Sequence, residues 1–124
     1  MKTELNEIEV NGVKYVKKGS TDFQEAEKYN DMPYVIIRTY SAGVHAGYLE
    51  KKEVKEVTLR KSRRIHYWLG AASLSQMAID GVSKPHDCRF ALELDKIKLT
   101  EAIEILYCTE KARDNIHGVP VWKM

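Results

Sequence analysis

The sequence has few residues that could serve as a covalent or metal framework. Its two cysteines, Cys88 and Cys108, lack a CxxC partner or a histidine-rich neighbourhood. Such usage is typical of reduced thiols in a cytosolic protein, with a single disulfide as the alternative. The four histidines have no pair at the spacing that metal ligation prefers, and the adjacent residues 86–88 point in different directions in an extended segment. We therefore expect no metal and no cofactor.

Long apolar runs and enzyme signatures are also absent from the sequence. No stretch is long enough to cross a bilayer, and the first ten residues carry acids where a signal peptide has its apolar core. We therefore expect a protein that is neither exported nor membrane-bound. The sequence contains no P-loop, no Rossmann glycine motif, no HExxH and no GxSxG. These absences argue against the common classes of nucleotide-dependent and hydrolytic enzymes.

The composition that remains is that of one soluble globular domain. The chain has 124 residues, of which 44% are hydrophobic and 31% charged, so residues 1–124 can build a single core. The net charge is only +2, but residues 51–64 hold seven cations and two acids. A local patch of this kind, with acids at both ends of the chain, favours a small anion over polymeric nucleic acid as the partner.

The sequence pattern predicts an α+β fold, with a largely antiparallel β-sheet, an N-terminal hairpin and two short helices in the C-terminal half. Residues 7–17 form two short β segments around Asn11-Gly12, the dipeptide that favours a type I′ turn. The polar residues 18–32 connect this hairpin to the rest, with room for a helical turn. Residues 1–32 are thus the hairpin and its connection, and residues 33–124 are the core of the domain.

Strands dominate the first half of this core. Residues 34–37 are apolar on both faces of a strand, which indicates a strand covered on both sides. We expect further strands at 44–50 and 56–68, joined by a polar turn at 51–55.

The strand at 56–68 has an irregular pattern. Val57, Leu59, Ile65 and Tyr67 share one parity and should face the core, yet Lys61 and Arg63 have the same parity. We favour a β-bulge that turns Lys61 outward. Arg63 and Arg64 point either outward or onto the inner surface, where they would meet an anion.

Two helices follow. Ser73 and Gln76 form a capping box for a helix over 71–81 that ends at Gly81, and Thr109 caps a last helix that ends near Gly118. Between them, the alternation of residues 90, 92 and 94 predicts a strand. Residues 97–106 satisfy both strand and helix spacing, and their β-branched content favours a strand.

The most informative segment is PYVIIRTYSAGVHAG, residues 33–47. Arg38 interrupts the buried strand, and a buried guanidinium needs an anionic or hydrogen-bonding partner. The small residues that follow it let a ligand approach the backbone closely. The alternative is a salt bridge from Arg38 to an acid of the same chain.

Other residue types suit a nucleotide-like ligand. Arginine forks bind phosphate oxygens, aromatic faces stack on a base, and hydroxyl or amide groups bind ribose. The candidates are Arg38, Arg63, Arg64 and Arg113 for phosphate, Tyr40, Tyr67, Trp68 and Phe90 for stacking, and Thr39, Ser41, Ser73 and Asn115 for hydrogen bonding. Each has a structural alternative, such as core packing for Trp68 or a helix cap for Ser73. Because the set holds no catalytic base or metal, it points to binding without turnover.

Three segments carry a resemblance to a known family. PYVIIRTYSAGVHAGYLE, SRRIHYWLGAASLSQMAIDGV and LTEAIEILYCTEKARDNI resemble segments of a small family of bacteriophage and prophage proteins, the Thoeris anti-defence family, first type. The similarity covers residues 33 to 122. It implies an N-terminal β-sheet region that carries C-terminal helices.

The resemblance also implies a function. In Thoeris defence, a TIR-domain protein makes a cyclic ADP-ribose isomer, which activates an effector that depletes NAD. Family members capture this signal and leave it intact. They form homodimers or dimer-based hexamers that hold the ligand at the subunit interface, and some also bind cyclic oligonucleotides. The implied location is the cytoplasm of the infected or lysogenic bacterial host.

The resemblance implies these residue roles. Arg38, Arg63, Arg64 and Arg113 would bind the diphosphate, and Tyr40, Trp68 and Phe90 would lie beside the adenine. The segment from Ser41 to His45 would allow close approach. The expected ligand-binding residues are Arg38, Thr39, Tyr40, Ser41, Gly43, Val44, His45, Arg63, Arg64, Trp68, Phe90 and Arg113.

Three other functions remain as alternatives. The protein could be an enzyme that hydrolyses the same signal, which would need an activating base or a metal. It could be a phage nucleic-acid-binding or accessory protein, as the cations of residues 51–64 suggest. It could also be a structural module without a ligand.

Overall fold

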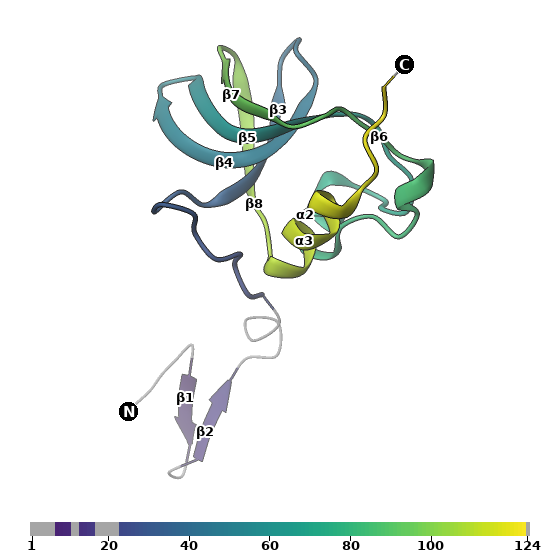
Figure 1. Ribbon diagram of the computed structural model, residues 1–124. Helices are drawn as coiled ribbons and strands as arrows, with labels where there is room; N and C mark the ends of the chain where they lie inside the picture. The colour runs from purple at the N-terminus through teal and green to yellow at the C-terminus, as the bar shows by residue number, and fades with distance from the viewer. Residues whose placement is uncertain (1–6, 11–12, 17–22, 124) are drawn as a thin grey trace.

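The computed structural model describes residues 7–10, 13–16 and 23–123 (Figure 1). It confirms the α+β fold that the sequence predicts. The elements, in chain order, are β1 Glu7–Val10, β2 Val13–Val16, β3 Tyr34–Thr39, β4 Val44–Glu53, β5 Glu56–Tyr67, α2 Leu74–Asp80, the short 3₁₀ helix η1 Pro85–Asp87, β6 Arg89–Phe90, β7 Leu94–Leu99, β8 Ala102–Tyr107 and α3 Glu110–Gly118.

β1 and β2 form the predicted hairpin, in which Val10 pairs with Val13. The predicted type I′ turn at Asn11-Gly12 and the first part of the predicted connection, residues 17–22, lie outside the described residues. The described part of that connection, residues 23–32, contains bridges and turns but no helix.

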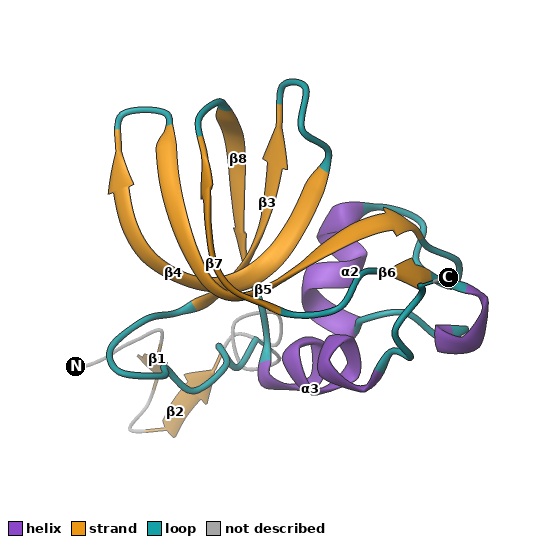
Figure 2. Ribbon diagram, turned by 45° about the horizontal axis from the view of Figure 1, so that its top comes forward, coloured by secondary structure: helices purple, strands orange, loops and turns teal. Residues whose placement is uncertain are grey.

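The main sheet has six strands and is antiparallel throughout. Its order is β6-β5-β4-β3-β8, and β7 pairs with the first half of β5. Figure 2 shows that the sheet is strongly curled and that α2 and α3 lie together beside one side of it. Register shifts in the β4–β5 pair at 46–48 and 49–51 allow this curvature, because a β-bulge bends and twists a strand.

The apolar run of β3 explains why the protein has two hydrophobic clusters. Tyr34 and Ile36 face the helices, where they pack with Met77 and Ile116. Val35 and Ile37, on the other face of β3, belong to a second cluster that only strand residues form. This cluster lies inside the curled sheet. All four β3 residues are fully buried, so the prediction of a strand covered on both sides is confirmed.

The predicted bulge in β5 is also confirmed, and it corrects the predicted facing of that strand. Lys61 has a φ of +52°, in the left-handed region. Before this bulge, Val57 and Leu59 face the inside of the curl. After it, Ile65 faces the helices, and Tyr67 is 45% exposed instead of buried. The expectation that these residues share one core face was therefore wrong, because the bulge changes the parity of the strand.

Several predicted boundaries were also wrong. β4 continues to Glu53, so the turn is shorter than the predicted 51–55. The strand predicted through residues 90–94 is interrupted, since β6 ends at Phe90 and β7 begins at Leu94. Residues 97–106 are strand as expected, but a turn at 100–101 divides them between β7 and β8.

Both predicted helices are present. α2 begins at Leu74, later than the predicted 71, and its N-cap Ser73 accepts a hydrogen bond from the backbone N–H of Gln76 at 3.1 Å. α3 follows its predicted N-cap Thr109 and buries Ala112 and Ile116. None of the described helices has the length and apolar character needed to cross a bilayer.

Candidate functional site

Arg38, which interrupts the buried run of β3, projects to the surface. Its side chain is 48% exposed, and its Nε donates to Oε1 of Glu104 on the neighbouring strand β8 at 2.9 Å. The structure therefore follows the salt-bridge alternative, and a phosphate at Arg38 would compete with Glu104. An exposed pair of this kind contributes little to stability.

The small residues after Arg38 form the tight turn between β3 and β4. The Thr39 hydroxyl donates to the carbonyl of Gly43 at 2.7 Å and accepts from the N–H of Ala42 at 2.8 Å. Gly43 has a φ of +86° and open space where a Cβ would lie. Ser41 donates to Glu101 at 3.3 Å, and Tyr40 is 77% exposed. Most of this predicted close-approach segment thus serves to close a turn.

Arg63 has a structural role. Its guanidinium is buried and donates to five backbone carbonyls, at distances from 2.8 to 3.5 Å: Ala91, Ile116, Val119, Phe90 and Pro120. These bonds join β5 to the end of α3 and to the C-terminal segment. Because a guanidinium has only five N–H groups, these contacts leave no N–H of Arg63 free for the predicted phosphate contact.

Trp68, Phe90 and Arg113 are also occupied by structural contacts. The indole N–H of Trp68 donates to the carbonyl of Ala71 at 3.2 Å. Phe90 is fully buried, with the Arg63 guanidinium 5.4 Å from its ring centre.

Arg113 contacts Asp114 at 3.0 Å and the carbonyl of Glu27 at 3.2 Å. The side chain of Asn115, a candidate ribose ligand, instead binds the N–H and the carbonyl of Val82, each at 2.8 Å. Val44 packs against the helix-facing cluster. These predicted ligand residues are therefore not gathered in one site.

Two predicted residues do meet in a cavity of about 310 Å³. His45 on β4 and Arg64 on β5 are direct partners in the antiparallel register, so their side chains lie side by side. The cavity opens on the inner side of the curled sheet. Its lining residues are His45, Ser62, Arg64, His66, Ala91, Leu92, Leu94 and Ile97.

The His45 imidazole is fully buried in the wall of this cavity. Its Nε2 lies 3.0 Å from the carbonyl oxygen of Ala42. Since a carbonyl only accepts, Nε2 carries the proton, and Nδ1 bears a lone pair in the neutral ring. Nδ1 has no hydrogen-bond partner within the described part of the chain.

Burial lowers the pKa of His45 from its ordinary value of 6.5, the Ala42 hydrogen bond opposes this shift, and the nearby charges of Arg64 and His66 add to it. Burial disfavours the charged imidazolium. His45 is therefore neutral at pH 7, with Nδ1 as an acceptor.

The charge of the cavity suits an anion. Its lining contains arginine and histidine but no acid. Arg64 is exposed and forms no ion pair with any described residue, in contrast to Arg38 and Arg113. Its guanidinium is therefore available for a charge-assisted hydrogen bond to a ligand.

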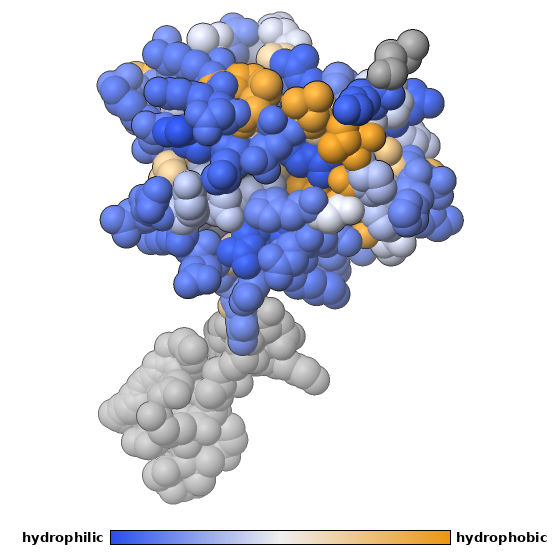
Figure 3. Space-filling view, in the orientation of Figure 1, coloured by the Kyte–Doolittle hydropathy of each residue, from blue (hydrophilic) through white to orange (hydrophobic). Residues whose placement is uncertain are grey.

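An aromatic shelf, formed by Tyr67 and Trp122 with Arg89, continues from the cavity. The His66 ring, which lines the cavity, lies 5.2 Å from the Trp122 ring. The Arg89 guanidinium lies 5.7 Å from the Tyr67 ring and 5.5 Å from the Trp122 ring. Tyr67 is 45% and Trp122 46% exposed. Figure 3 shows apolar side chains gathered on the face beside the C-terminal end of the chain.

Several residues of this region were not predicted. His66 had a usable signal, because it follows Arg64 by two positions and so shares its face of β5. Trp122 and Arg89 had none, since they reach the shelf through the tertiary fold. Trp122 is placed there by its backbone N–H, which donates to the backbone carbonyl of Phe90 at 2.9 Å.

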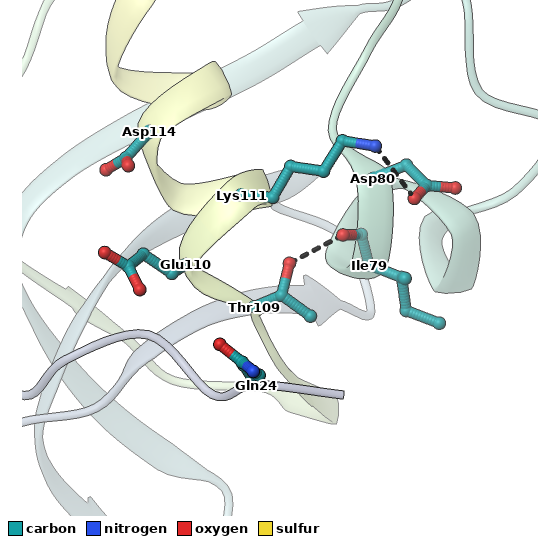
Figure 4. Close-up of a pocket in the computed structure, with 7 residues that line it drawn as sticks. All are labelled: Gln24, Ile79, Asp80, Thr109, Glu110, Lys111 and Asp114. Carbon is teal, nitrogen blue, oxygen red and sulfur yellow. Dashed lines mark hydrogen bonds and ion pairs between the residues drawn. The ribbon is translucent and has the colours of Figure 1, made fainter. Parts of the chain in front are cut away.

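A second cavity, of about 650 Å³, lies between the end of α2 and the start of α3 (Figure 4). Three acids line it, Asp80, Glu110 and Asp114, and its single lysine, Lys111, pairs with Asp80 at 3.4 Å. This lining would repel a phosphate. In the described residues, no group of three or more histidine, cysteine or acidic side chains is arranged to hold a metal ion.

Comparison with known proteins finds a family but no assigned activity. A family model described as "Domain of unknown function (DUF6948)" matches residues 32–116, which include all of β3 to β8 and most of α3. No curated protein and no solved structure matches the chain.

Proposed function

Since the chain belongs to the DUF6948 family, whose description assigns no activity, we propose a function from the site itself. The protein is a binding protein that captures a nucleotide-like anion, the cyclic ADP-ribose isomer made by TIR-domain Thoeris proteins, and does not cleave it. Sequestration of this signal blocks activation of the effector. The resemblance of residues 33 to 122 to phage anti-defence proteins supplies the identity of the ligand.

The observation that carries the proposal is the cavity in which Arg64 meets buried His45 with no acidic side chain in the lining. Arg64 would bind a phosphate oxygen, and the exposed rings of Tyr67 and Trp122 would stack on adenine. Base stacking on an aromatic side chain contributes about 1–3 kcal/mol per base in nucleic-acid-binding proteins. The anion and the base are thus each given a suitable neighbour.

The size of the cavity supports a role for a second subunit. A volume of about 310 Å³ lies near the lower end of small-molecule sites, about 300–1,000 Å³. It suits a sugar phosphate better than a whole cyclic dinucleotide. A sponge also needs tight binding, and nanomolar affinity corresponds to about −12 kcal/mol. Enclosure of the remaining ligand by a second copy would desolvate the diphosphate and supply further contacts.

Hydrolysis of the signal is a second candidate, because two imidazoles, His45 and His66, line the same cavity. An imidazole can act as a general base. Against this role, burial lowers the pKa of His45 and makes it a weaker base, and the lining holds no acidic side chain that could orient either ring.

Polymeric nucleic acid is a weaker candidate. Three of the cations at 51–64 are occupied, because Lys51 pairs with Glu53, Arg60 contacts Glu50 and Asp95, and Arg63 is buried. These pairings interrupt the basic face that a duplex would need.

One experiment separates capture from hydrolysis. The full chain is mixed with the cyclic ADP-ribose isomer, passed through a desalting column and heat-denatured, and the released ligand is identified by mass spectrometry. We expect intact signal in stoichiometric amount from the native chain and little from the Arg64→Gln variant. Converted product in either the protein or the small-molecule fraction would establish an enzyme instead, and unchanged signal confined to the small-molecule fraction would refute both.

A further inference from the structure

The buried ring of His45, a residue that lines the cavity, leaves one polar atom without a partner. Antiparallel pairing with Arg64 fixes the position of this residue in the sheet, and the contact of Nε2 with the Ala42 carbonyl at 3.0 Å fixes the ring. Nδ1 is thereby defined as a lone-pair acceptor. It makes no hydrogen bond within the described residues, although its exposed surface is negligible.

A buried acceptor without a donor is energetically unfavourable, so the ligand that fills this cavity should supply one. Phosphate oxygens only accept at neutral pH, and so they cannot satisfy Nδ1. Arg64, by contrast, only donates. The two neighbours therefore require opposite groups of one ligand, an anion for Arg64 and an N–H or O–H donor for His45.

We propose that Nδ1 of His45 accepts a hydrogen bond from a ribose hydroxyl, while Arg64 binds the adjacent phosphate, so that the cavity selects ribose phosphates over their deoxy analogues. This inference rests on the cavity of the proposed function, but it concerns the chemical class of the ligand and not the identity of the signal. Ser62, 1% exposed in the same lining, supplies a second group that can bind a hydroxyl.

Selection for a hydroxyl by Nδ1 of His45 follows from the burial of this acceptor. A site built to bind a hydroxyl discriminates against an analogue without it, because the buried partner is then left unsatisfied. From the free energy of one hydrogen bond, we expect about 5- to 10-fold discrimination.

The test uses a matched pair of probes, adenosine 5′-monophosphate and 2′,3′-dideoxyadenosine 5′-monophosphate. They share the base and the phosphate and differ only in the two hydroxyls. Titration calorimetry with the full chain at pH 7.5 should give about 5- to 10-fold tighter binding of the ribonucleotide. Equal affinity for the two probes, or binding of neither at millimolar concentration, would overturn the inference.

Three variants assign the discrimination to its atom. In His45→Phe, which keeps a ring but lacks Nδ1, the affinity ratio should fall to about 1. In His45→Asn, whose amide oxygen can replace Nδ1 as an acceptor, part of the ratio should remain. In Arg64→Gln, both probes should bind more weakly with the ratio preserved. A native ratio in His45→Phe would refute the role of Nδ1.

A spectroscopic measurement keeps the inference testable if His45→Phe does not fold. In the ¹⁵N-histidine-labelled native chain, the Nδ1 resonance of His45 should move on addition of the ribonucleotide and stay unprotonated. Protonation of Nδ1 or an unchanged resonance would refute the hydrogen bond. If the cyclic signal binds but the probes are not distinguished, this inference fails and the proposed function survives. If the probes are distinguished but the cyclic signal does not bind, this inference survives and the proposed function fails.

Discussion

At the scale of single residues, the adjacent arginines Arg63 and Arg64 have opposite roles. Arg63 is buried, with all of its N–H groups directed at backbone carbonyls, whereas Arg64 is exposed in the cavity lining. Strand alternation alone separates them, since neighbours in a strand point to opposite faces. Which of the two is buried could not be predicted, because the Lys61 bulge determines which face each residue after it occupies on β5.

Replacement of the two arginines by methionine should therefore have different effects. Arg63→Met removes the donors of five buried carbonyls, and we expect a loss of about 3 kcal/mol or more in unfolding free energy. Arg64→Met should change stability by less than about 0.5 kcal/mol but reduce ligand binding. Urea denaturation of both variants checks this, and equal stability losses would contradict the assignment.

Protonation of His45 should make the protein less stable in acid. Its folded-state pKa lies below the ordinary 6.5, mainly because of burial, so the unfolded chain takes up a proton first as the pH falls. Unfolding free energy should thus be constant above pH 7.5 and decrease as the pH falls through 6.5. The pKa of His117 is lowered as well, mainly by burial, and adds to this dependence.

The contribution of His45 can be isolated by substitution. His45→Asn should flatten the decrease in unfolding free energy between pH 7.5 and 5.5, whereas the exposed His86→Asn serves as a control and should leave it unchanged. Urea denaturation at several pH values measures both. An undiminished decrease in His45→Asn would show that other groups cause the acid sensitivity.

At the scale of elements, local patterns predicted most of the fold but not its interruptions. The double-faced apolar run of β3, the hairpin, both helix caps and the bulge were all visible in the sequence. The end of β6 at Phe90 was not visible in the sequence. Leu92 continues the apolar alternation of Phe90 and Leu94, although residues 91–93 belong to no strand. The ligand region was only partly predictable for the same reason. His45 and Arg64 meet through strand pairing, whereas Trp122 arrives from the far end of the chain.

The contact between α2 and α3 should depend strongly on Gly81. This residue is the C-cap of α2, with a φ of +77°, and a Cβ there would lie 2.5 Å from the side chain of Asn115. Gly81→Ala should lower unfolding free energy by more than 2 kcal/mol, roughly the sum of strain and steric overlap. It should also disturb the bonds of Asn115 to Val82.

Gly43→Ala is the matched control for this prediction. Gly43 also has positive φ, +86°, but nothing lies within 4 Å of the added Cβ. Gly43→Ala should lower the unfolding free energy by about 1 kcal/mol, from backbone strain alone. Thermal unfolding of both variants would test the difference. Equal losses in unfolding free energy would show that the Asn115 side chain can move away from the added Cβ without destabilising the protein.

At the scale of the whole molecule, the cavity opens beside exposed apolar side chains. Leu92, Leu94, Val121 and Trp122 are each 46–49% exposed, which is the kind of surface that a second copy can cover. We expect binding of the cyclic signal to require self-association. Dilution below the dimer dissociation constant, measured by analytical ultracentrifugation, should abolish binding. A monomer with full affinity would contradict a shared site.

Phosphorus NMR of the cyclic ADP-ribose isomer, recorded for hours in the presence of an equimolar amount of the full chain, tests the central claim most directly. We predict that both diphosphate resonances shift or broaden at once, stay unchanged thereafter and return to their free positions after the protein is denatured. Resonances that never respond to the protein, or new resonances that grow with time, would contradict capture without cleavage.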